Sequence, residues 1–255
     1  AVDGDFGEHT EKNTSEDLFA SGEALQQLIE LGYIEDYGDD KKKAFNVAKA
    51  EQEYNMGLSL KFTGKLKKAI PHYLAAKDLF PDDERYNYSL ADCYIQLRRF
   101  DEARSIIDHI NKLEKKKLIH NYDFLEGMVY AGQARADKAL EFFLKAEKAK
   151  FITPQLYLQL GKQYLRISQY NKAMEMFDKA MILDDDNNLA YHGKALAYLY
   201  SGNYEDAADY FLRAIGLVYH FAPSHYFLGL TLIKLNKIAE ACQALELCVT
   251  LAPKH

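Results

Sequence analysis

The residues best suited to chemistry in this chain are eight histidines, three cysteines and a short acidic run. His220 and His225 lie close together in the sequence, but a metal site would also need carboxylate or thiolate ligands at matching spacing. Neither a His-Glu-x-x-His nor a Cys-x-x-Cys motif is present, and no glycine-rich phosphate loop occurs. The acidic run at 184–186 and the two asparagines after it lack the alternating ligands and later glutamate of a calcium loop, so we interpret the stretch at 184–188 as a cap for the following helix. The sequence therefore predicts a protein that is not an enzyme and holds no metal or other cofactor.

Charge and composition restrict the partners that this chain can have. The net charge of −6 disfavours nucleic acid or an acidic membrane surface, because both need a basic footprint. No apolar run approaches the roughly 18 residues of a membrane span, so no membrane insertion is expected. The number of cysteines is odd, and their spacing is not that of a disulfide framework, which disfavours a fold held together by disulfides; the three are Cys93, Cys242 and Cys248. The chain opens at Ala1 with no methionine and no signal peptide, which suggests a processed protein or an excised fragment and leaves the compartment open.

The elements that carry these residues are revealed by small residues that recur at a fixed interval. Six alanines follow one another at intervals of 34, 36, 34, 34 and 34 residues: Ala69, Ala103, Ala139, Ala173, Ala207 and Ala241. A second row lies twelve residues earlier in each copy: Gly57, Ala91, Gly127, Gly161, Ala195 and Gly229. Small residues at the same place in two successive helices let those helices approach closely. The pattern predicts a stack of repeated helical hairpins, an architecture that favours binding over catalysis.

Each repeated unit is predicted to be a helix, a short turn and a second helix. Bulky residues follow the first small residue by three positions and the alanine by four, which places them on one helix face. Turn residues include Gly64 in the first copy and Gly132-Gln133 in the third. We expect a polar leader at 1–17, a helical extension at 18–49 and six repeats over 50–255. The repeats span 50–83, 84–119, 120–153, 154–187, 188–221 and 222–255.

These small residues, the bulky residues between them and the prolines near the unit boundaries resemble the tetratricopeptide repeat family. All six copies keep the alanine of the family's twentieth place, and all have glycine or alanine at its eighth place. The family's usual tryptophan near the start of the repeat is absent from every copy. The resemblance covers about 206 of the 255 residues. It implies an all-α fold, a right-handed superhelix (α-solenoid) of six helix-turn-helix repeats.

In this family the first helices of successive repeats line a concave groove, and the resemblance implies which residues would face it. The expected partner-binding residues are Tyr54, Leu58, Tyr88, Phe124, Met128, Lys162, His192, Tyr200 and Tyr226. Most of them are apolar or aromatic, so the groove would suit an extended or helical segment of a protein partner. Burial between neighbouring helices is the alternative for each of these residues. A family clamp for terminal carboxylates is disfavoured, because Tyr54, Leu58 and Ser89 replace three of its polar residues.

A second resemblance lies upstream of the repeats. The stretch 25–34, which contains Leu31, Gly32 and Tyr33, is similar to the segment that closes the catalytic domain in some bacterial sulfatases and type I phosphodiesterases. Some of those enzymes, which belong to the alkaline-phosphatase superfamily, carry tetratricopeptide tails directly after such a helix. This resemblance implies an accessory domain of a metal-dependent hydrolase whose catalytic domain is absent from the chain.

Three functions therefore remain open. The preferred one is a non-catalytic scaffold that binds a protein or peptide segment, or a domain of its own full-length chain, on the groove. The second is the hydrolase accessory domain. The third is a scaffold that self-associates through the C-terminal repeat, because the sequence ends shortly after Pro253 without a further capping helix.

Overall fold

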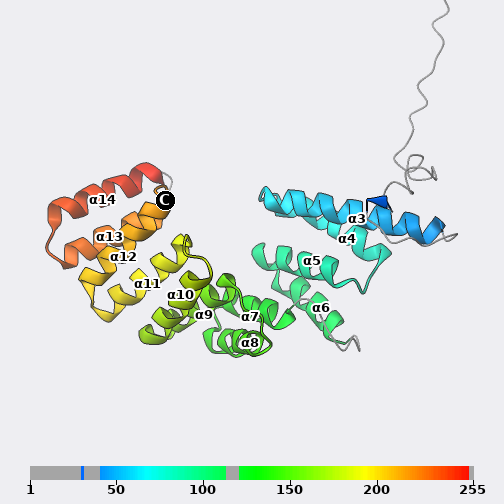
Figure 1. The fold of residues 1–255 in the computed structure, drawn as a ribbon, viewed down its shortest axis with the longest axis horizontal. Helices are drawn as coiled ribbons and strands as arrows, with labels where there is room; N and C mark the ends of the chain where they lie inside the picture. The colour runs from blue at the N-terminus through cyan, green and yellow to red at the C-terminus, as the bar shows by residue number, and fades with distance from the viewer. Residues whose placement is uncertain (1–29, 32–40, 113–120, 253–255) are drawn as a thin grey trace, which may run out of the picture. The chain divides into compact units, whose positions relative to one another are not determined.

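The computed structural model describes residues 30–31, 41–112 and 121–252, and these residues form helices and turns without a strand (Figure 1). The helices are α3 (Lys41–Phe62), α4 (Leu66–Leu79), α5 (Glu84–Gln96), α6 (Phe100–Asn111), α7 (Tyr122–Gly132), α8 (Ala136–Lys148), α9 (Pro154–Arg166), α10 (Tyr170–Leu183), α11 (Asn188–Ser201), α12 (Tyr204–Leu217), α13 (Ala222–Lys234) and α14 (Ile238–Leu251). The all-α fold expected from the sequence is confirmed. The leader expected at 1–17 lies outside the described residues.

Short turns join the helices into six pairs, and each turn has one residue with a left-handed backbone. These residues, with their φ angles, are Gly64 (72°), Arg98 (60°), Ala134 (61°), Ser168 (59°), Gly202 (88°) and Asn236 (59°). They follow one another at the same intervals as the alanines, so each turn has its left-handed residue at the same place in the repeat. The third turn was expected at Gly132-Gln133, but α7 ends at Gly132 and the left-handed residue is Ala134. The place in the repeat, rather than the residue type, decides where the chain reverses.

Side-chain caps start four of the first helices of these pairs. Asp83, Asn121, Thr153 and Asn187 each accept a hydrogen bond from a backbone N–H of the first turn. Within the stretch at 184–188 that was expected to cap the next helix, Asn187 is the residue that supplies the cap. Asn187 Oδ1 accepts from the Ala190 N–H at 3.2 Å, while Asp184 Oδ2 accepts from Asn187 Nδ2 at 2.8 Å. The acidic run supports the cap instead of supplying it.

Two compact units, divided between Leu97 and Arg98, make up the chain. In the first unit, α3 packs against α4 and α4 packs against α5. Tyr73 of α4 is fully buried, and an added Cβ at Gly57 of α3 would come within 2.6 Å of its ring. Helix α3 runs without a break through position 50, so the end of the expected extension and the first helix of the first repeat are one helix of 22 residues.

In the second unit, each helix from α6 to α14 packs against the next one along the chain (Figure 1). The rings of Phe143, Phe177 and Phe211, one from each of α8, α10 and α12, are fully buried. Phe143 lies against Gly127, and Phe177 lies between Gly161 of α9 and Gly193 of α11. These contacts pair a bulky residue of the second helix with a small residue of a first helix, as the spacing predicts.

The first helices of the second unit form a continuous layer. Helix α9 contacts both α7 and α11, and α11 also contacts α13. Among the described residues, neighbouring second helices make no comparable contacts with each other. The layer of α7, α9, α11 and α13 therefore presents one shared face on which side chains from four repeats come together.

Candidate partner-binding surface

Residues four apart on a helix lie on the same side, so each first helix of the second unit contributes one row to the shared face. We call the side chains of these rows that reach solvent the first-helix surface. It consists of Met128 of α7, Lys162 and Arg166 of α9, His192, Leu196 and Tyr200 of α11, and Tyr226, Leu230 and Lys234 of α13. Five of the nine residues expected from the sequence belong to it.

Phe124 does not belong to this surface. Its side chain is only 7% exposed, and its ring lies 5.7 Å from that of Phe143 and 5.2 Å from that of Phe151. Phe124 is thus a core residue, which is the alternative that the sequence left open for each expected contact. The burial of Phe124 could not be predicted from the repeat, because spacing only places a residue on one side of a helix. The aromatic residue at 151, which covers Phe124, lies outside the repeated pattern.

His192 links two repeats. Its Nδ1 lies 2.9 Å from the hydroxyl of the fully buried Ser224, and its ring packs against Phe211, Phe221 and Phe227 at centroid distances of 5.2–5.7 Å. Burial, and secondarily the charge of Lys162, lowers the pKa of His192 to about 4. The imidazole is therefore neutral near pH 7, and it joins α11 to the start of α13, with only part of the ring at the surface.

The charges of the first-helix surface all have the same sign. Lys162, Arg166 and Lys234 lie in its rows, and no carboxylate does. Solvent reaches Lys162, yet the protein around its ammonium group desolvates it and lowers its pKa, and Arg166 lowers that pKa further. Arg166 itself donates to the carbonyl of Ala131 at 2.8 Å. Among the described residues, no carboxylate pairs with Lys162, which leaves its charge uncompensated.

Two tyrosines supply the exposed aromatic area of this surface. Tyr200 is 51% exposed, with its ring 6.3 Å from that of Tyr170. Tyr226 is 45% exposed and meets Phe227 edge-on at 5.2 Å. A surface that carries both exposed tyrosines and cations can bind rings and carboxylates together.

The remaining expected contacts lie in the first unit. Tyr54 is half-buried, with its ring 5.9 Å from that of Tyr73 and 5.1 Å from that of Tyr86. Leu58 is 38% exposed, one turn further along α3. Tyr88 is half-buried on α5, and burial, with a smaller effect of Asp92, raises its pKa to about 12. Tyr54 therefore contributes mainly to packing in this unit, while Leu58 is the more accessible of the three.

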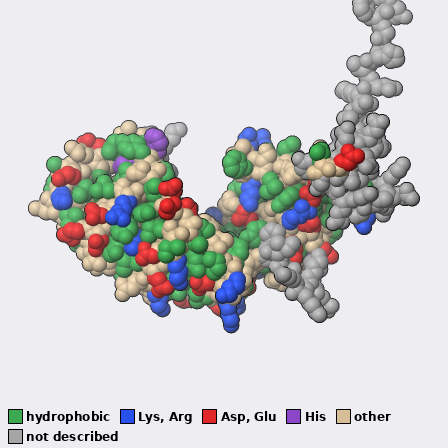
Figure 2. All heavy atoms as spheres, viewed as in Figure 1, with side chains coloured by type: hydrophobic (Ala, Val, Ile, Leu, Met, Phe, Trp, Pro, Cys, Tyr) green, Lys and Arg blue, Asp and Glu red, His purple; other side chains and the backbone are tan. Residues whose placement is uncertain are grey.

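The described ranges offer neither a metal site nor a membrane span. No group of three or more histidines, cysteines or carboxylates there could hold a metal ion. None of the helices that the structure describes is both long and apolar enough to cross a membrane. The three cysteines are free thiols. Figure 2 shows hydrophobic, basic and acidic side chains interspersed over the visible face.

Comparison with known proteins places these helical pairs in a family. Residues 63–121 match the tetratricopeptide repeat family, and residues 166–248 match the family described as anaphase-promoting complex, cyclosome, subunit 3. Solved tetratricopeptide structures superpose on the fold, including the Cut9–Hcn1 hetero-tetramer of the anaphase-promoting complex, with a TM-score of 0.74 over 94% of this chain and 50% of that chain at 16% identity. The chain is a tetratricopeptide repeat protein. Another structure, of the type IV pilus biogenesis factor PilW, has a TM-score of 0.70 over 81% of this protein and 94% of that chain, also at 16% identity.

Curated relatives of this tetratricopeptide repeat protein are longer than it is. The BBSome complex member BBS4 of Bos taurus is 26% identical over 195 residues, which are 76% of this chain and 37% of that protein. The protein O-mannosyl-transferase TMTC1 of Homo sapiens is 28% identical over 207 residues, which are 79% of this chain and 23% of that protein. The chain thus spans little more than a third of the first relative and less than a quarter of the second. The shared fold supports a protein-interaction scaffold.

The hydrolase resemblance of residues 25–34 gains no support from these comparisons. Most of that stretch, including Gly32 and Tyr33, lies outside the described residues. Nothing in the matched families or in the relatives named above joins the repeats to a sulfatase or phosphodiesterase.

Proposed function

We propose that this protein is a non-catalytic scaffold whose first-helix surface binds an acidic, partly apolar segment of a protein partner. The observation that carries the proposal is the set of three cations, Lys162, Arg166 and Lys234, in rows that have no carboxylate. Tyr200 and Tyr226 belong to the same surface and add exposed aromatic area. The partner should therefore offer both carboxylates and bulky apolar side chains.

The electrostatics of Lys162 favour such a partner. Desolvation of an ammonium group costs free energy unless an opposite charge compensates it, and here the surrounding protein desolvates the group without supplying a carboxylate. A partner carboxylate placed beside Lys162 would relieve this cost and would also steer association. A basic segment would meet three like charges and would be repelled.

A photo-crosslinking experiment tests where the partner binds. A photoreactive benzoylphenylalanine replaces Tyr200 in one variant and Ile182 in the control, because Ile182 is 82% exposed on the second helix α10. We expect irradiation in cell extract to join the Tyr200 variant to a defined segment rich in aspartate or glutamate, which mass spectrometry would identify. Equal yields from both positions, or capture only of basic segments by the Tyr200 variant, would contradict the proposal.

Self-association is a second candidate function, and the exposed end of the last repeat favours it. Val249 is 67% exposed and Ile233 is 46% exposed. One repeat earlier, Ile215 and Leu199 are half-buried against a core cluster that contains Leu228 of α13. A second copy of the chain could cover Val249 and Ile233 in the same manner. Light scattering should then show a mass that rises with concentration and that Val249→Lys returns to the monomer value; a constant monomer mass would exclude this candidate.

A further inference from the structure

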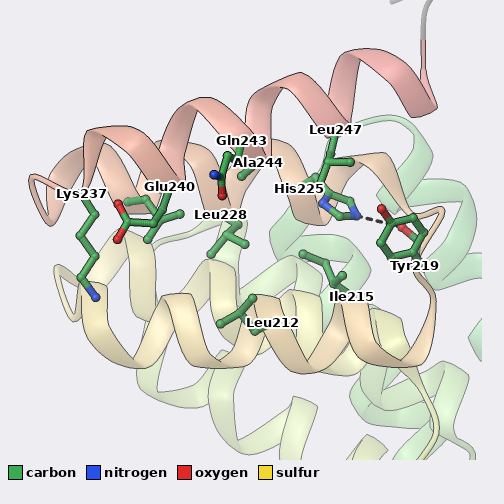
Figure 3. A pocket seen from close by; sticks show the side chains of 11 residues that line it. Leu212, Ile215, Tyr219, His225, Leu228, Lys237, Glu240, Gln243, Ala244 and Leu247 are labelled. Atoms are coloured by element: carbon green, nitrogen blue, oxygen red, sulfur yellow. Dashed lines mark hydrogen bonds between the residues drawn. The ribbon is translucent and has the colours of Figure 1, made fainter.

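An open apolar cavity of about 430 Å³ lies between α12 and α14, with α13 as its floor (Figure 3). Leu212 and Ile215 line it from α12, Leu228 from α13, and Ala244 and Leu247 from α14. His225 closes one end, where its Nε2 bonds to the backbone carbonyl of Tyr219 at 2.8 Å. The volume falls within the range of about 300–1,000 Å³ that is typical of binding pockets.

Earlier repeats fill the corresponding place with a large side chain of their own. Ala244 stands one repeat after Tyr210, two after Met176 and three after Phe142. The Tyr210 ring lies 5.4 Å from Tyr198, and the Lys194 ammonium group lies 4.7 Å from its centroid. Phe142 stacks on Tyr130 at 5.4 Å, and Met176 is only 6% exposed. The cavity therefore exists because the last repeat has an alanine at the position where the three preceding repeats have an aromatic ring or a thioether.

The polar groups around this place are replaced together with the ring. In the preceding repeat, Lys194 pairs with Asp178 at 2.5 Å, and the Arg213 guanidinium lies 5.1 Å from the Tyr210 ring. The residues 34 positions later are Leu228 for Lys194, Leu212 for Asp178 and Leu247 for Arg213. Three leucines thus stand where the preceding repeat has an ion pair and a further cation. The place between α12 and α14 therefore lacks the large side chain and has an apolar lining instead of a charged one.

We infer that this cavity receives a bulky apolar side chain, an aromatic ring above all, from a partner polypeptide. The apolar lining without a buried charge selects an apolar group, and the missing Tyr210-like ring sets its size. Lys237, Glu240 and Gln243 stand at the edge of the cavity, all exposed (Figure 3). Among the described residues none of these three groups is hydrogen-bonded or ion-paired, so donors and an acceptor are available for the backbone that carries the ring.

This site differs from the first-helix surface and goes beyond the proposed function. On α13, His225, Leu228 and Leu232 line the cavity, whereas Tyr226, Leu230 and Lys234 belong to the first-helix surface. At about 100° per residue, the two sets face different sides of the helix. A partner bound in the cavity need not contact the first-helix surface, so substitutions at one site can be tested without changing the other.

A random-peptide phage library, panned on the full chain, tests the inference. The decisive variant is Ala244→Tyr, which restores the residue type of Tyr210, and the matched control is Ala239→Tyr at an exposed position of the same helix. We expect selected peptides with a shared Phe, Trp or Leu anchor whose affinity falls at least about tenfold with Ala244→Tyr. Affinity should be unchanged with Ala239→Tyr and with Lys162→Glu, which affects only the first-helix surface.

Several outcomes would overturn the inference. Peptides that lack a bulky apolar anchor, or whose affinity Ala244→Tyr leaves unchanged, would show that the cavity takes no such side chain. A wild-type dimer that Ala244→Tyr converts to a monomer would make a second copy the occupant. If Ala244→Tyr lowers the thermal midpoint, Leu247→Arg serves instead, because it returns the Arg213-like charge to the cavity and should weaken the same peptides.

Discussion

At the scale of single residues, close packing depends on glycines that face a ring from both sides. Phe177 lies between Gly161 and Gly193, and an added Cβ at these positions would come within 2.6 Å and 2.4 Å of its ring. We expect Gly193→Ala to lower the free energy of unfolding by roughly 1–3 kcal/mol, because the ring has glycine on both sides and must shift. Urea denaturation measures this change.

Gly216 provides the control for that prediction. It lies in α12, and an added Cβ there would meet no atom within 4 Å. Gly216→Ala should leave stability unchanged or raise it by up to about 1 kcal/mol through helix propensity. Equal effects of the two alanines would show that the contact with Phe177 does not determine the cost.

His192 should make stability depend on pH. Its pKa is lowered to about 4 in the folded chain from an ordinary value near 6.5, so between these values the unfolded state binds more protons. The contribution of the neutral imidazole is therefore complete above about pH 6.5 and is lost as the pH falls toward 4, by up to roughly 3 kcal/mol. Urea denaturation at several pH values should show a smaller loss in His192→Gln; parallel curves for both proteins would contradict the assignment.

At the scale of elements, the turns between paired helices hold backbone strain. Ala134 adopts a φ of 61°, a conformation that costs a residue with a Cβ about 1 kcal/mol or more. Ala134→Gly should therefore raise the free energy of unfolding by about 0.5–1 kcal/mol, although glycine also gains entropy in the unfolded chain. Thermal and urea unfolding should both show the gain; a destabilised variant would mean that the alanine methyl group makes a contact worth more than the strain.

The helical hairpins could be predicted from the sequence because their signal is local and is repeated six times. Ala173 and Phe177 are four residues apart on one helix, and such spacings fix which side faces the neighbour. Other features depend on contacts that spacing does not contain. Phe124 is buried by Phe151, which lies outside the repeated rows, and the left-handed residue of the third turn is an alanine rather than a glycine.

The partner-binding surface could be predicted only in part. Tyr200 and Tyr226 are exposed where the resemblance placed them, but that placement alone does not make them contacts. That the charge of Lys162 is uncompensated could not be predicted from the sequence, because spacing along the chain does not show which carboxylates lie near it in the fold. The cavity beside Ala244 was missed, although the sequence carries its signal: Leu228, Leu247 and Ala244 interrupt rows that hold charged or bulky residues in the preceding repeat.

At the scale of the whole molecule, the chain consists of two compact units, and the equal repeats of the sequence give no sign of that division. The boundary after Leu97 falls at the turn inside the second repeat rather than between repeats. Within the second unit, each helix contacts its neighbours along the stack, and the shared first-helix surface follows from that order. The proposed binding surface thus belongs to several repeats together, and no single hairpin could provide it.

The affinity of acidic peptides for charge-reversed variants tests the central claim most directly. Peptides selected from a random library for the first-helix surface are titrated by calorimetry against the wild type, Lys162→Glu and the control Lys172→Glu on α10. The account predicts acidic peptides with aromatic side chains, an affinity at least about tenfold lower for Lys162→Glu, and little change for Lys172→Glu. Equal affinities for the wild type and Lys162→Glu, or a preference for basic peptides, would contradict it.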